Sequence, residues 1–303
     1  MERFDLASRL DLEIADLLAA IAVLNADRNE GLRRQMKVIT RACNAAGVRP
    51  VWLKGACDLL PERGPESGRM MLDLDFWVPD VADQRRTHDV LNNLGYSWEE
   101  MEPTHYSLEP DRHHYPPYLH PDEMARIELH RFVVSLENQP ILPNDEAERN
   151  IEWLEWEGTR IGRLDPMFGM LCSFVQCTSG GTGEFEHGYI PLMKACDFVK
   201  RIHEDFGGQI PSAMIARLER AGWERTARQF FTLTELYFGL PNPLPADGRL
   251  VQAMERRILH PQVQFCIMNT RLLLSNRGLN LLRRPSRIPK AALRFLQSMQ
   301  IVR

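Results

Sequence analysis

Two aspartates separated by a single leucine, Asp73 and Asp75, lie inside the apolar run MMLDLDFWV, which is typical of a β-strand. Residues i and i+2 of a strand point to the same side, so the two carboxylates would converge on one patch. Their repulsion is costly unless a cation neutralises it, and Mg²⁺ prefers such oxygen ligands. The pattern therefore indicates a site for a divalent cation, although two acids on the solvent face of an edge strand would have the same spacing.

Other residues that suit this chemistry lie on either side of the aspartates. Upstream, Lys54, Gly55 and Ala56 end one predicted strand and begin a short helix. A glycine there lets the backbone approach a phosphate, the amides at a helix N-terminus favour an anion, and Arg69 could reach the same anion. Downstream, Glu128 alternates with apolar residues in RIELHRF, as an acid in any half-buried strand would. Three carboxylates on neighbouring strands, facing one side, would form a cage for two metal ions.

The combination of these motifs resembles the uncharacterised nucleotidyltransferase family of the polymerase-β superfamily. GVRPVWLKGACDLL, an arginine ahead of MMLDLDFWV, and ARIELHRF are similar to the family's lysine–glycine turn, its Arg before a D-x-D strand and its E-L-H strand. The superfamily usually has Gly-Gly or Gly-Ser after its first strand, whereas Gly55-Ala56 here leaves the phosphate contacts to the backbone and the lysine. The similarity spans roughly residues 36–245 and so extends into the helical half.

The resemblance implies an Mg²⁺-dependent enzyme that moves a nucleoside monophosphate from an NTP to a hydroxyl or phosphate acceptor on a small molecule, a peptide or a protein, releasing pyrophosphate. Asp73 and Asp75 would hold the ion that bridges the phosphates of the nucleotide. With Glu128 they would hold a second ion at the acceptor oxygen, about 3.5–4 Å from the first, and Glu128 could also serve as general base. Lys54 and Arg69 would stabilise the triphosphate as pyrophosphate leaves.

The nucleotide site that the resemblance implies also includes two residues of the helical half. Lys194 and Asp197 stand three residues apart, as in the helices of the family, and a surface ion pair between them is an equal alternative. No motif in the sequence indicates which base the nucleotide carries. The residues expected to contact the nucleotide are Lys54, Gly55, Ala56, Arg69, Lys194 and Asp197.

Five histidines crowd one region of the sequence and suggest zinc as an alternative ligand. They are His105, His113, His114, His120 and His130. No pair has the tight Cys/His spacing of a structural zinc site, so HHYPPYLHPDE is more simply interpreted as a hairpin that lines the acceptor cleft with His113 and His114. His130 shares a strand face with Glu128 by alternation, so we expect it beside the same cleft as a packed or hydrogen-bonded side chain.

Two other functions fit parts of the pattern. A noncatalytic partner that binds a nucleotide or a peptide could keep the same fold, but it would have no need of the three clustered acids. A sugar transferase could use the D-x-D motif with a nucleotide-sugar, but that function leaves Glu128 and the lysine–glycine turn without a role. Donor preference separates the two transferases, and metal dependence separates both from the binding protein.

These residues require a small sheet with flanking helices, and the sequence predicts an α+β fold that provides it. Hydrophobic periodicity predicts two helices in residues 1–49 and a mixed catalytic sheet with flanking helices over residues 50–164. Asp165 is expected to cap the next helix, which begins at Pro166. The helical period then continues almost to the end. We therefore expect a nucleotidyltransferase-like domain over residues 1–164 and an all-helical domain, with a basic C-terminal tail, over residues 165–303.

The composition of the chain narrows the class of protein and the compartment in which we expect it. The 303 residues are 44% hydrophobic and 26% charged, as in ordinary soluble proteins. No apolar run approaches the roughly 20 residues that cross a bilayer, and the N-terminus lacks the basic-then-apolar order of a signal peptide. The six cysteines form no CxxC pair. We therefore expect a cytoplasmic protein without a membrane span.

The charge is unevenly distributed along the chain. The net charge is −4, but residues 256–303 contain ten Lys or Arg and no acid, which leaves −14 for the rest. The acidic body disfavours broad nucleic-acid binding, whereas the basic segment leaves a peptide or RNA partner open. A solvated helical end that pairs with the acidic body of its own chain is the simpler interpretation of that segment.

Overall fold

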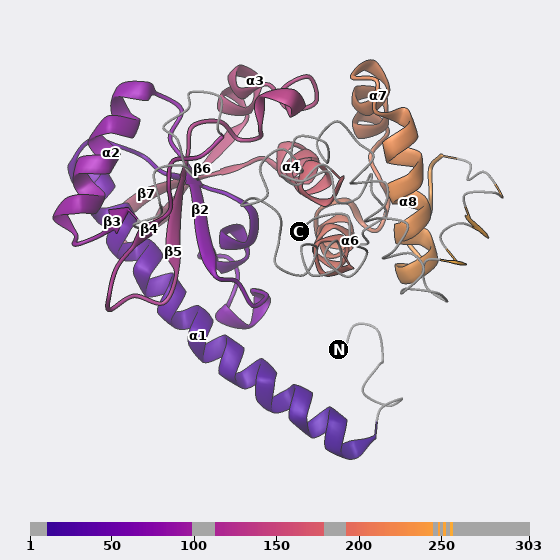
Figure 1. The fold of residues 1–303 in the computed structure, drawn as a ribbon, viewed down its shortest axis with the longest axis horizontal. Helices are drawn as coiled ribbons and strands as arrows, with labels where there is room; N and C mark the ends of the chain where they lie inside the picture. Colours follow the sequence, from indigo (N-terminus) through magenta and orange to yellow (C-terminus); the bar gives the residue numbers. More distant parts are fainter. Residues whose placement is uncertain are drawn as a thin grey trace, which may run out of the picture. The chain divides into compact units, whose positions relative to one another are not determined.

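The computed structural model describes residues 11–98, 113–178 and 192–244, together with residues 248, 251, 252, 255 and 256. The chain divides into two compact units, residues 1–172 and 173–303. The first unit combines helices with one mixed sheet, and the described part of the second is helical (Figure 1). The fold is therefore α+β, as the sequence predicts.

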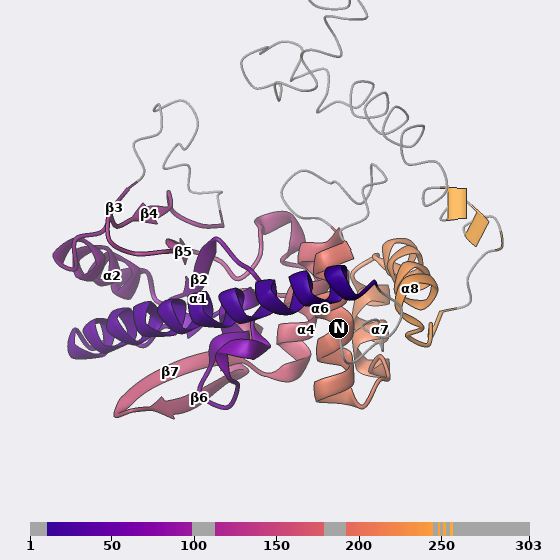
Figure 2. The same ribbon diagram turned by 90° about the horizontal axis from the view of Figure 1, so that it is seen from below.

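One mixed sheet of seven strands forms the centre of the first unit. In chain order its strands are β1 (Val51–Trp52), β2 (Asp73–Trp77), β3 (Ser97–Trp98), β4 (Tyr118–Leu119), β5 (Arg126–His130), β6 (Ile151–Trp156) and β7 (Thr159–Leu164). They pair in the order β3-β4-β5-β2-β1-β7-β6, and Figure 2 labels all of them except β1. At the centre, β2 is parallel to β5 and antiparallel to β1, so two strands that are far apart in the sequence become direct neighbours.

Two helices, α1 (Leu12–Ala45) and α2 (Val81–Asn93), bury one face of this sheet. Leu74 and Phe76 of β2 lie in the same buried cluster as Met36 of α1. Each large apolar side chain that is buried in this way contributes about 1.5–3 kcal/mol relative to exposure. Because side chains alternate across a strand, packing this face against the helices leaves the acids of β2 on the opposite face.

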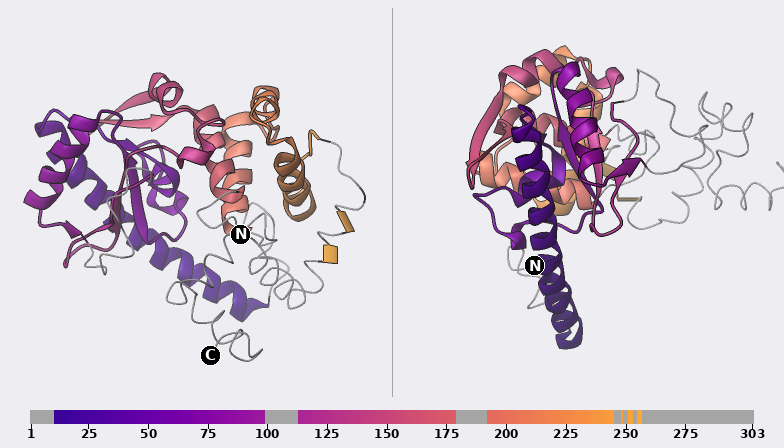
Figure 3. Two further views of the ribbon diagram at one scale, coloured as in Figure 1. Left: turned by 45° about the horizontal axis from the view of Figure 1, so that its top comes forward. Right: turned by 90° about the vertical axis from the view of Figure 1, so that its left-hand side faces the viewer.

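The N-terminal region is one helix of 34 residues, which Figure 3 shows unbroken in indigo, so the prediction of two helices was wrong. Asn25, Asn29 and Gly31 are residue types that favour turns, which is why the sequence suggests a break there. In the fold, Asn25 and Asn29 donate side-chain hydrogen bonds to the carbonyl of Gly68. Gly31 lets the helix approach Met124, whose sulfur would lie 2.9 Å from a Cβ at this position. Because of these tertiary contacts, α1 continues through residue types that often end a helix.

The hairpin of β6 and β7 was only half predicted. The segment IEWLEW of β6 places apolar residues without strict alternation, so it lacks the period of a strand, and the sequence predicts a strand only over WEGTRIGRL, which contains β7. The two strands nevertheless pair along six residue pairs. Glu157 and Gly158 join them with φ values of +50° and +78°, as a two-residue type I′ turn requires.

Shorter elements complete the first unit. The predicted brief helix after the first strand is the 3₁₀ helix η3 (Lys54–Leu59). The other short helices are η4 (Pro65–Ser67), η5 (Leu136–Asn138) and α3 (Asn144–Arg149). The sequence also predicts a strand at HYSLE (residues 105–109) and a helix at GRLVQAMERRIL (residues 248–259); the strand, most of that helix and residues 257–303 of the basic segment lie outside the described residues.

Aromatic side chains form the core of the second unit. Its described helices are the last turns of α4 (Pro166–Thr178), then α6 (Leu192–Phe206), α7 (Ser212–Arg220) and α8 (Glu224–Phe238). Phe230 packs edge-on against Phe174 and Phe198, with ring centroids 5.5 and 5.0 Å apart.

At the start of α4, Asp165 accepts a hydrogen bond from the amide of Phe168 at 2.7 Å, which confirms the predicted cap. None of the helices in the described part of the chain is long and apolar enough to span a membrane.

Candidate active site

The site begins with the register between the two central strands. β2 and β5 run parallel with Asp75 opposite Glu128 and Trp77 opposite His130. Residues that stand opposite one another in a sheet share a face. Asp75, Glu128 and His130 therefore lie together on the face that α1 and α2 leave uncovered, as the alternation in the sequence predicts.

Three side chains on this face gather their polar atoms in one place. Asp75, Glu128 and His130 each offer one ligand atom, and these atoms lie within 4.8 Å of one another. His130 is fully buried, and its Nε2 lies 2.8 Å from Oδ1 of Asp75, so it is hydrogen-bonded beside the acids as expected. Asp73 lies two residues earlier on the same face, half-buried and outside this set of three.

A lysine contacts the central aspartate. Nζ of Lys54 lies 2.5 Å from Oδ1 of Asp75, the same oxygen that His130 contacts. The backbone of Lys54 has φ of +55°, a left-handed conformation that is strained for a residue with a side chain. The strain costs on the order of 1–3 kcal/mol and is typical of residues that a functional site holds in place. The pair was not predictable from spacing, since 21 residues separate its members.

Burial and charge together set the protonation of these groups. Burial opposes the charges of Lys54 and Asp75, but their mutual attraction outweighs it, so the pKa of Lys54 lies above its ordinary range and the pKa of Asp75 well below. A hydrogen bond from His130 lowers the pKa of Asp75 further. For Glu128, burial and the negative charge of Asp75 act in the same direction and raise its pKa to about 7. Asp75 is therefore ionised and paired with Lys54, whereas Glu128 takes up a proton near neutral pH.

The residues expected at the phosphates lie close to this pair. Gly55 is buried, and a Cβ at its position would lie 3.6 Å from Nη2 of Arg69 and 3.3 Å from Sδ of Met71. The guanidinium of Arg69 therefore lies beside the lysine–glycine turn. Ala56 is part of the hydrophobic core, and its amide donates to the carbonyl of Leu53 at 3.2 Å. Lys54, Gly55 and Arg69 thus form a positively charged end of the site.

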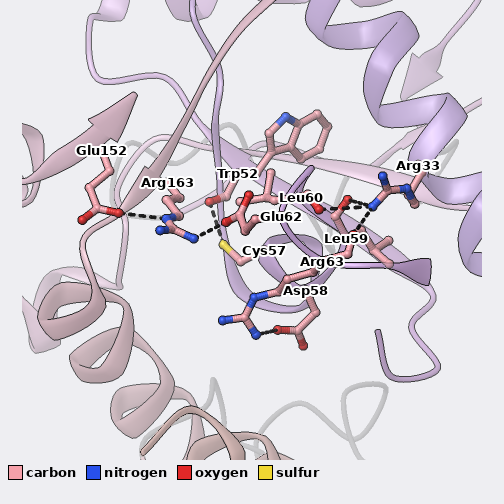
Figure 4. Close-up of polar contacts among 10 residues, drawn as sticks. All are labelled: Arg33, Trp52, Cys57, Asp58, Leu59, Leu60, Glu62, Arg63, Glu152 and Arg163. Carbon is pink, nitrogen blue, oxygen red and sulfur yellow. Dashed lines mark hydrogen bonds and ion pairs between the residues drawn. The ribbon is translucent and has the colours of Figure 1, made fainter. Parts of the chain in front are cut away.

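The segment that carries Lys54 is anchored to the first helix. Arg33 of α1 donates through Nη1 to the carbonyl oxygens of Leu59, Leu60 and Arg63, at 2.8, 3.1 and 2.7 Å (Figure 4). Leu59 and Leu60 end η3, where backbone acceptors have no partner within the helix, and Arg63 follows just beyond it. One half-buried guanidinium therefore holds the C-terminal end of the helix that starts at Lys54.

Ion pairs hold the same segment on its other side. Figure 4 shows Arg163 of β7 between Glu62 and Glu152, with Nε of Arg163 2.9 Å from the Glu152 carboxylate. Asp58 is buried and lies 3.6 Å from Arg63. Because η3 is fixed from both sides, the strained backbone at Lys54 is held where its ammonium meets Asp75.

Two more histidines pack around His130. The ring centroids of His113 and His114 lie 5.3 and 5.8 Å from that of His130, so the structure brings these three predicted residues together. Burial and the neighbouring rings lower the pKa of His113 to about 2 and that of His114 to about 4, which keeps both neutral at pH 7. His120 packs elsewhere, against Tyr96. His105 lies outside the described residues.

Lys194 and Asp197 belong to the second unit. Both are on α6, three residues apart, and Nζ of Lys194 lies 3.4 Å from the carbonyl oxygen of Gln176 on α4. Their expected contact with a nucleotide stays a prediction.

The acid cluster fits a divalent cation. Oxygen atoms of Asp75 and Glu128, with Asp73 at the start of the same strand, are the hard ligands that Mg²⁺ prefers. The pKa of Glu128 is raised by burial first and by the negative charge of Asp75 second. A bound cation would neutralise that charge. The only set of three metal-ligating side chains found in the described part of the chain is Asp75, Glu128 and His130, and it contains no cysteine.

We expect Glu128→Gln to stabilise the metal-free protein at high pH. In the unfolded chain Glu128 ionises near its ordinary pKa of 4.5, whereas in the fold it ionises near 7. The unfolded state therefore loses its proton first, and a penalty on the folded state develops between these values and is complete above pH 7. Glutamine does not ionise and can still donate a hydrogen bond to Asp75. The variant should exceed the wild type by about 1–3 kcal/mol in the free energy of unfolding at pH 8.

Urea unfolding in the presence of EDTA checks this expectation. At pH 5 the two proteins should differ much less than at pH 8, because most of the penalty on the wild type is then absent. A difference of equal size at both pH values would contradict the raised pKa of Glu128.

Comparison with known proteins adds one finding. A family model described as an uncharacterised nucleotidyltransferase matches residues 2–239. The matched span contains the lysine–glycine turn, the D-x-D strand, Glu128, and Lys194 and Asp197 on α6. No curated protein and no solved structure matches the chain.

Proposed function

The chain belongs to this family of uncharacterised nucleotidyltransferases, and we propose that it moves a nucleoside monophosphate from an NTP to a hydroxyl or phosphate group of a small molecule, a peptide or a protein, in a reaction that requires Mg²⁺ and releases pyrophosphate. One observation supports the proposal most directly. The parallel register of β2 and β5 puts Asp75 beside Glu128, on the face that also holds Lys54.

The proposed metal site uses the acids of both strands. Asp73 and Asp75 would hold the ion that meets the phosphates, and Asp75 with Glu128 would hold a second ion near the acceptor. Bound Mg²⁺ supplies neutralisation of the negative charge that develops on the phosphate oxygens. The residues fit this use, because Asp73, Asp75 and Glu128 supply oxygen ligands.

The transfer itself breaks one phosphorus–oxygen bond and forms another. The acceptor oxygen attacks the α-phosphorus, and the bond to the bridging oxygen of pyrophosphate breaks. Glu128 would take the proton from an acceptor hydroxyl, as a carboxylate within reach of the attacking oxygen can. Lys54 and Arg69, beside Gly55, would face the triphosphate and stabilise the charge on the leaving pyrophosphate. His113 and His114, neutral at pH 7, would line the acceptor side.

Calorimetric titration of the four NTPs tests the proposal. We expect one NTP to bind tightly to the full chain, only with Mg²⁺, and not to bind the double variant Asp73→Asn/Asp75→Asn. Asp145→Asn is the matched control, because this exposed carboxylate lies on α3 and pairs with Arg149. An α-labelled NTP should then yield labelled acceptor, or labelled nucleoside monophosphate when water is the acceptor. Absence of Mg²⁺-dependent binding of every NTP would overturn the proposal.

A further inference from the structure

His130 contacts acceptor atoms at both of its ring nitrogens. Nδ1 lies 3.2 Å from the carbonyl oxygen of Phe132, and Nε2 lies 2.8 Å from Oδ1 of Asp75. The ring is fully buried, so water does not supply other partners. A carbonyl oxygen only accepts hydrogen bonds, and so does an ionised carboxylate. A neutral imidazole carries one proton, and one of the two contacts is then without a donor.

Without a cation, the shorter contact holds the proton on Nε2, which donates to the Asp75 carboxylate and gives the Phe132 carbonyl no donor from the ring. With the proton on Nδ1 instead, the ring donates to the Phe132 carbonyl, and the lone pair of Nε2 is available to a cation held with Asp75. Histidines that bind metals usually donate their other N–H to a backbone carbonyl or a carboxylate, which fixes the tautomer and the ring orientation. The Phe132 carbonyl stands where such an outer partner stands.

The surrounding rings keep the imidazole in this orientation. His113 packs on His130 at an interplanar angle of 62° and His114 at 47°. His130 also stands opposite the bulky Trp77, at the end of β5. Nε2 is therefore directed at the acids by packing as well as by the Phe132 carbonyl, and its place in the set with Asp75 and Glu128 follows from the fold.

We propose that Nε2 of His130 is a ligand of the cation held by Asp75 and Glu128, so that this position binds a first-row transition-metal ion more tightly than Mg²⁺. The inference rests on the proposed function for the presence of a cation. It adds that the ligand set is two carboxylates and one imidazole. Imidazole suits transition metals, whereas Mg²⁺ prefers oxygen and gives up water reluctantly. The other proposed position, at Asp73 and Asp75, would remain an all-oxygen site.

Electron spin echo spectroscopy with Mn²⁺ tests the ligand directly. The full chain is freed of metal and given less than one equivalent of Mn²⁺. We expect modulation from a ¹⁴N nucleus bound to Mn²⁺, and its replacement by a ¹⁵N signal when the protein is labelled with ¹⁵N-histidine. This comparison needs no substitution, so the folding of a variant does not limit it.

Two variants then identify the residue. His130→Gln should lose the nitrogen signal and weaken Mn²⁺ binding by at least about tenfold, while Mg²⁺ affinity, measured by competition, changes less. Glutamine keeps an N–H that can donate to Asp75, so a loss that came only from a missing donor would not appear. His114→Gln is the control, because His114 is an adjacent imidazole outside the ligand set, and it should keep the signal.

The outcomes separate this inference from the proposed function. In one outcome, Mn²⁺ binds the wild type and not Asp75→Asn, but the spectrum shows no nitrogen bound to Mn²⁺. This result would overturn the imidazole ligand and leave the proposed metal-dependent transferase intact. His130 would then be a donor that positions Asp75. Failure of Mn²⁺ and Mg²⁺ to bind at all, with or without NTP, would overturn both.

Discussion

Replacing Asp75 by asparagine should reduce nucleotidyl transfer by about 10³-fold or more, the largest loss expected from any single change in this site. Asp75 is the centre of the cluster: Lys54 and His130 both contact its Oδ1, and Glu128 stands opposite it on β5. Asparagine keeps the shape and one acceptor oxygen but removes the negative charge that a cation requires. The rate of pyrophosphate release from the NTP that binds, measured for the variant and for the wild type, gives this ratio.

Folding of this variant must be followed separately. Asparagine removes the carboxylate that contacts the half-buried ammonium of Lys54, and breaking a buried pair in this way can cost about 3–5 kcal/mol. Thermal unfolding with and without Mg²⁺ distinguishes the two effects, because a folded variant that has lost its cation should gain no stability from Mg²⁺. Asp145→Asn should behave as the wild type. A folded Asp75→Asn that keeps activity within tenfold of the wild type would contradict the assignment.

Replacing Lys54 by methionine should change two properties in opposite directions. Transfer should fall by about 10²–10³-fold, because the ammonium that we propose to face the triphosphate is lost. Binding of a divalent cation without nucleotide should become stronger, by roughly tenfold. The ammonium lies 2.5 Å from Oδ1 of Asp75 and competes there with any metal ion. At this distance in a partly buried site, the interaction between one positive charge and one carboxylate is worth at least about 1.4 kcal/mol. Its removal should therefore change the affinity for the cation by about a factor of ten.

Calorimetric titration of Mn²⁺ into the nucleotide-free proteins measures the second effect. Lys37→Met is the matched control, because Lys37 pairs with Glu157 at the hairpin turn, away from the acids, and should alter neither property. Weaker metal binding by Lys54→Met would contradict a competition for Asp75. The same experiment in the presence of NTP should abolish the difference if the triphosphate draws Lys54 away from Asp75.

Much of the local architecture follows from the sequence. Alternation in LDLDF places both aspartates on one side of a strand, and alternation in RIELH does the same for Glu128 and His130. The cap at Asp165 was also predicted, because the pattern lies within a few residues of chain.

Other elements were misjudged where distant contacts outweighed local preference. Asn25 and Asn29 look like turn residues, but the loop at Gly68 uses them as donors, and one helix results. β6 lacks the period of a strand and forms because β7 pairs with it. In both cases partners that are remote in sequence supply free energy that exceeds the small intrinsic preference of the residues.

The sequence by itself determined which side chains share a strand face, and it indicated the family to which they belong. Only the tertiary structure decided how the two strands meet. A shift of one residue between β2 and β5 would move Glu128 away from Asp75, and the buried face against α1 and α2 prevents it. The contact between Lys54 and Asp75 likewise depends on η3, which Arg33 and Arg163 hold from outside. The register of β2 and β5 and the anchoring of η3 both arise from packing between segments that are distant in the sequence. The positions of Asp75, Glu128 and Lys54 relative to one another therefore depend on contacts that no short motif contains.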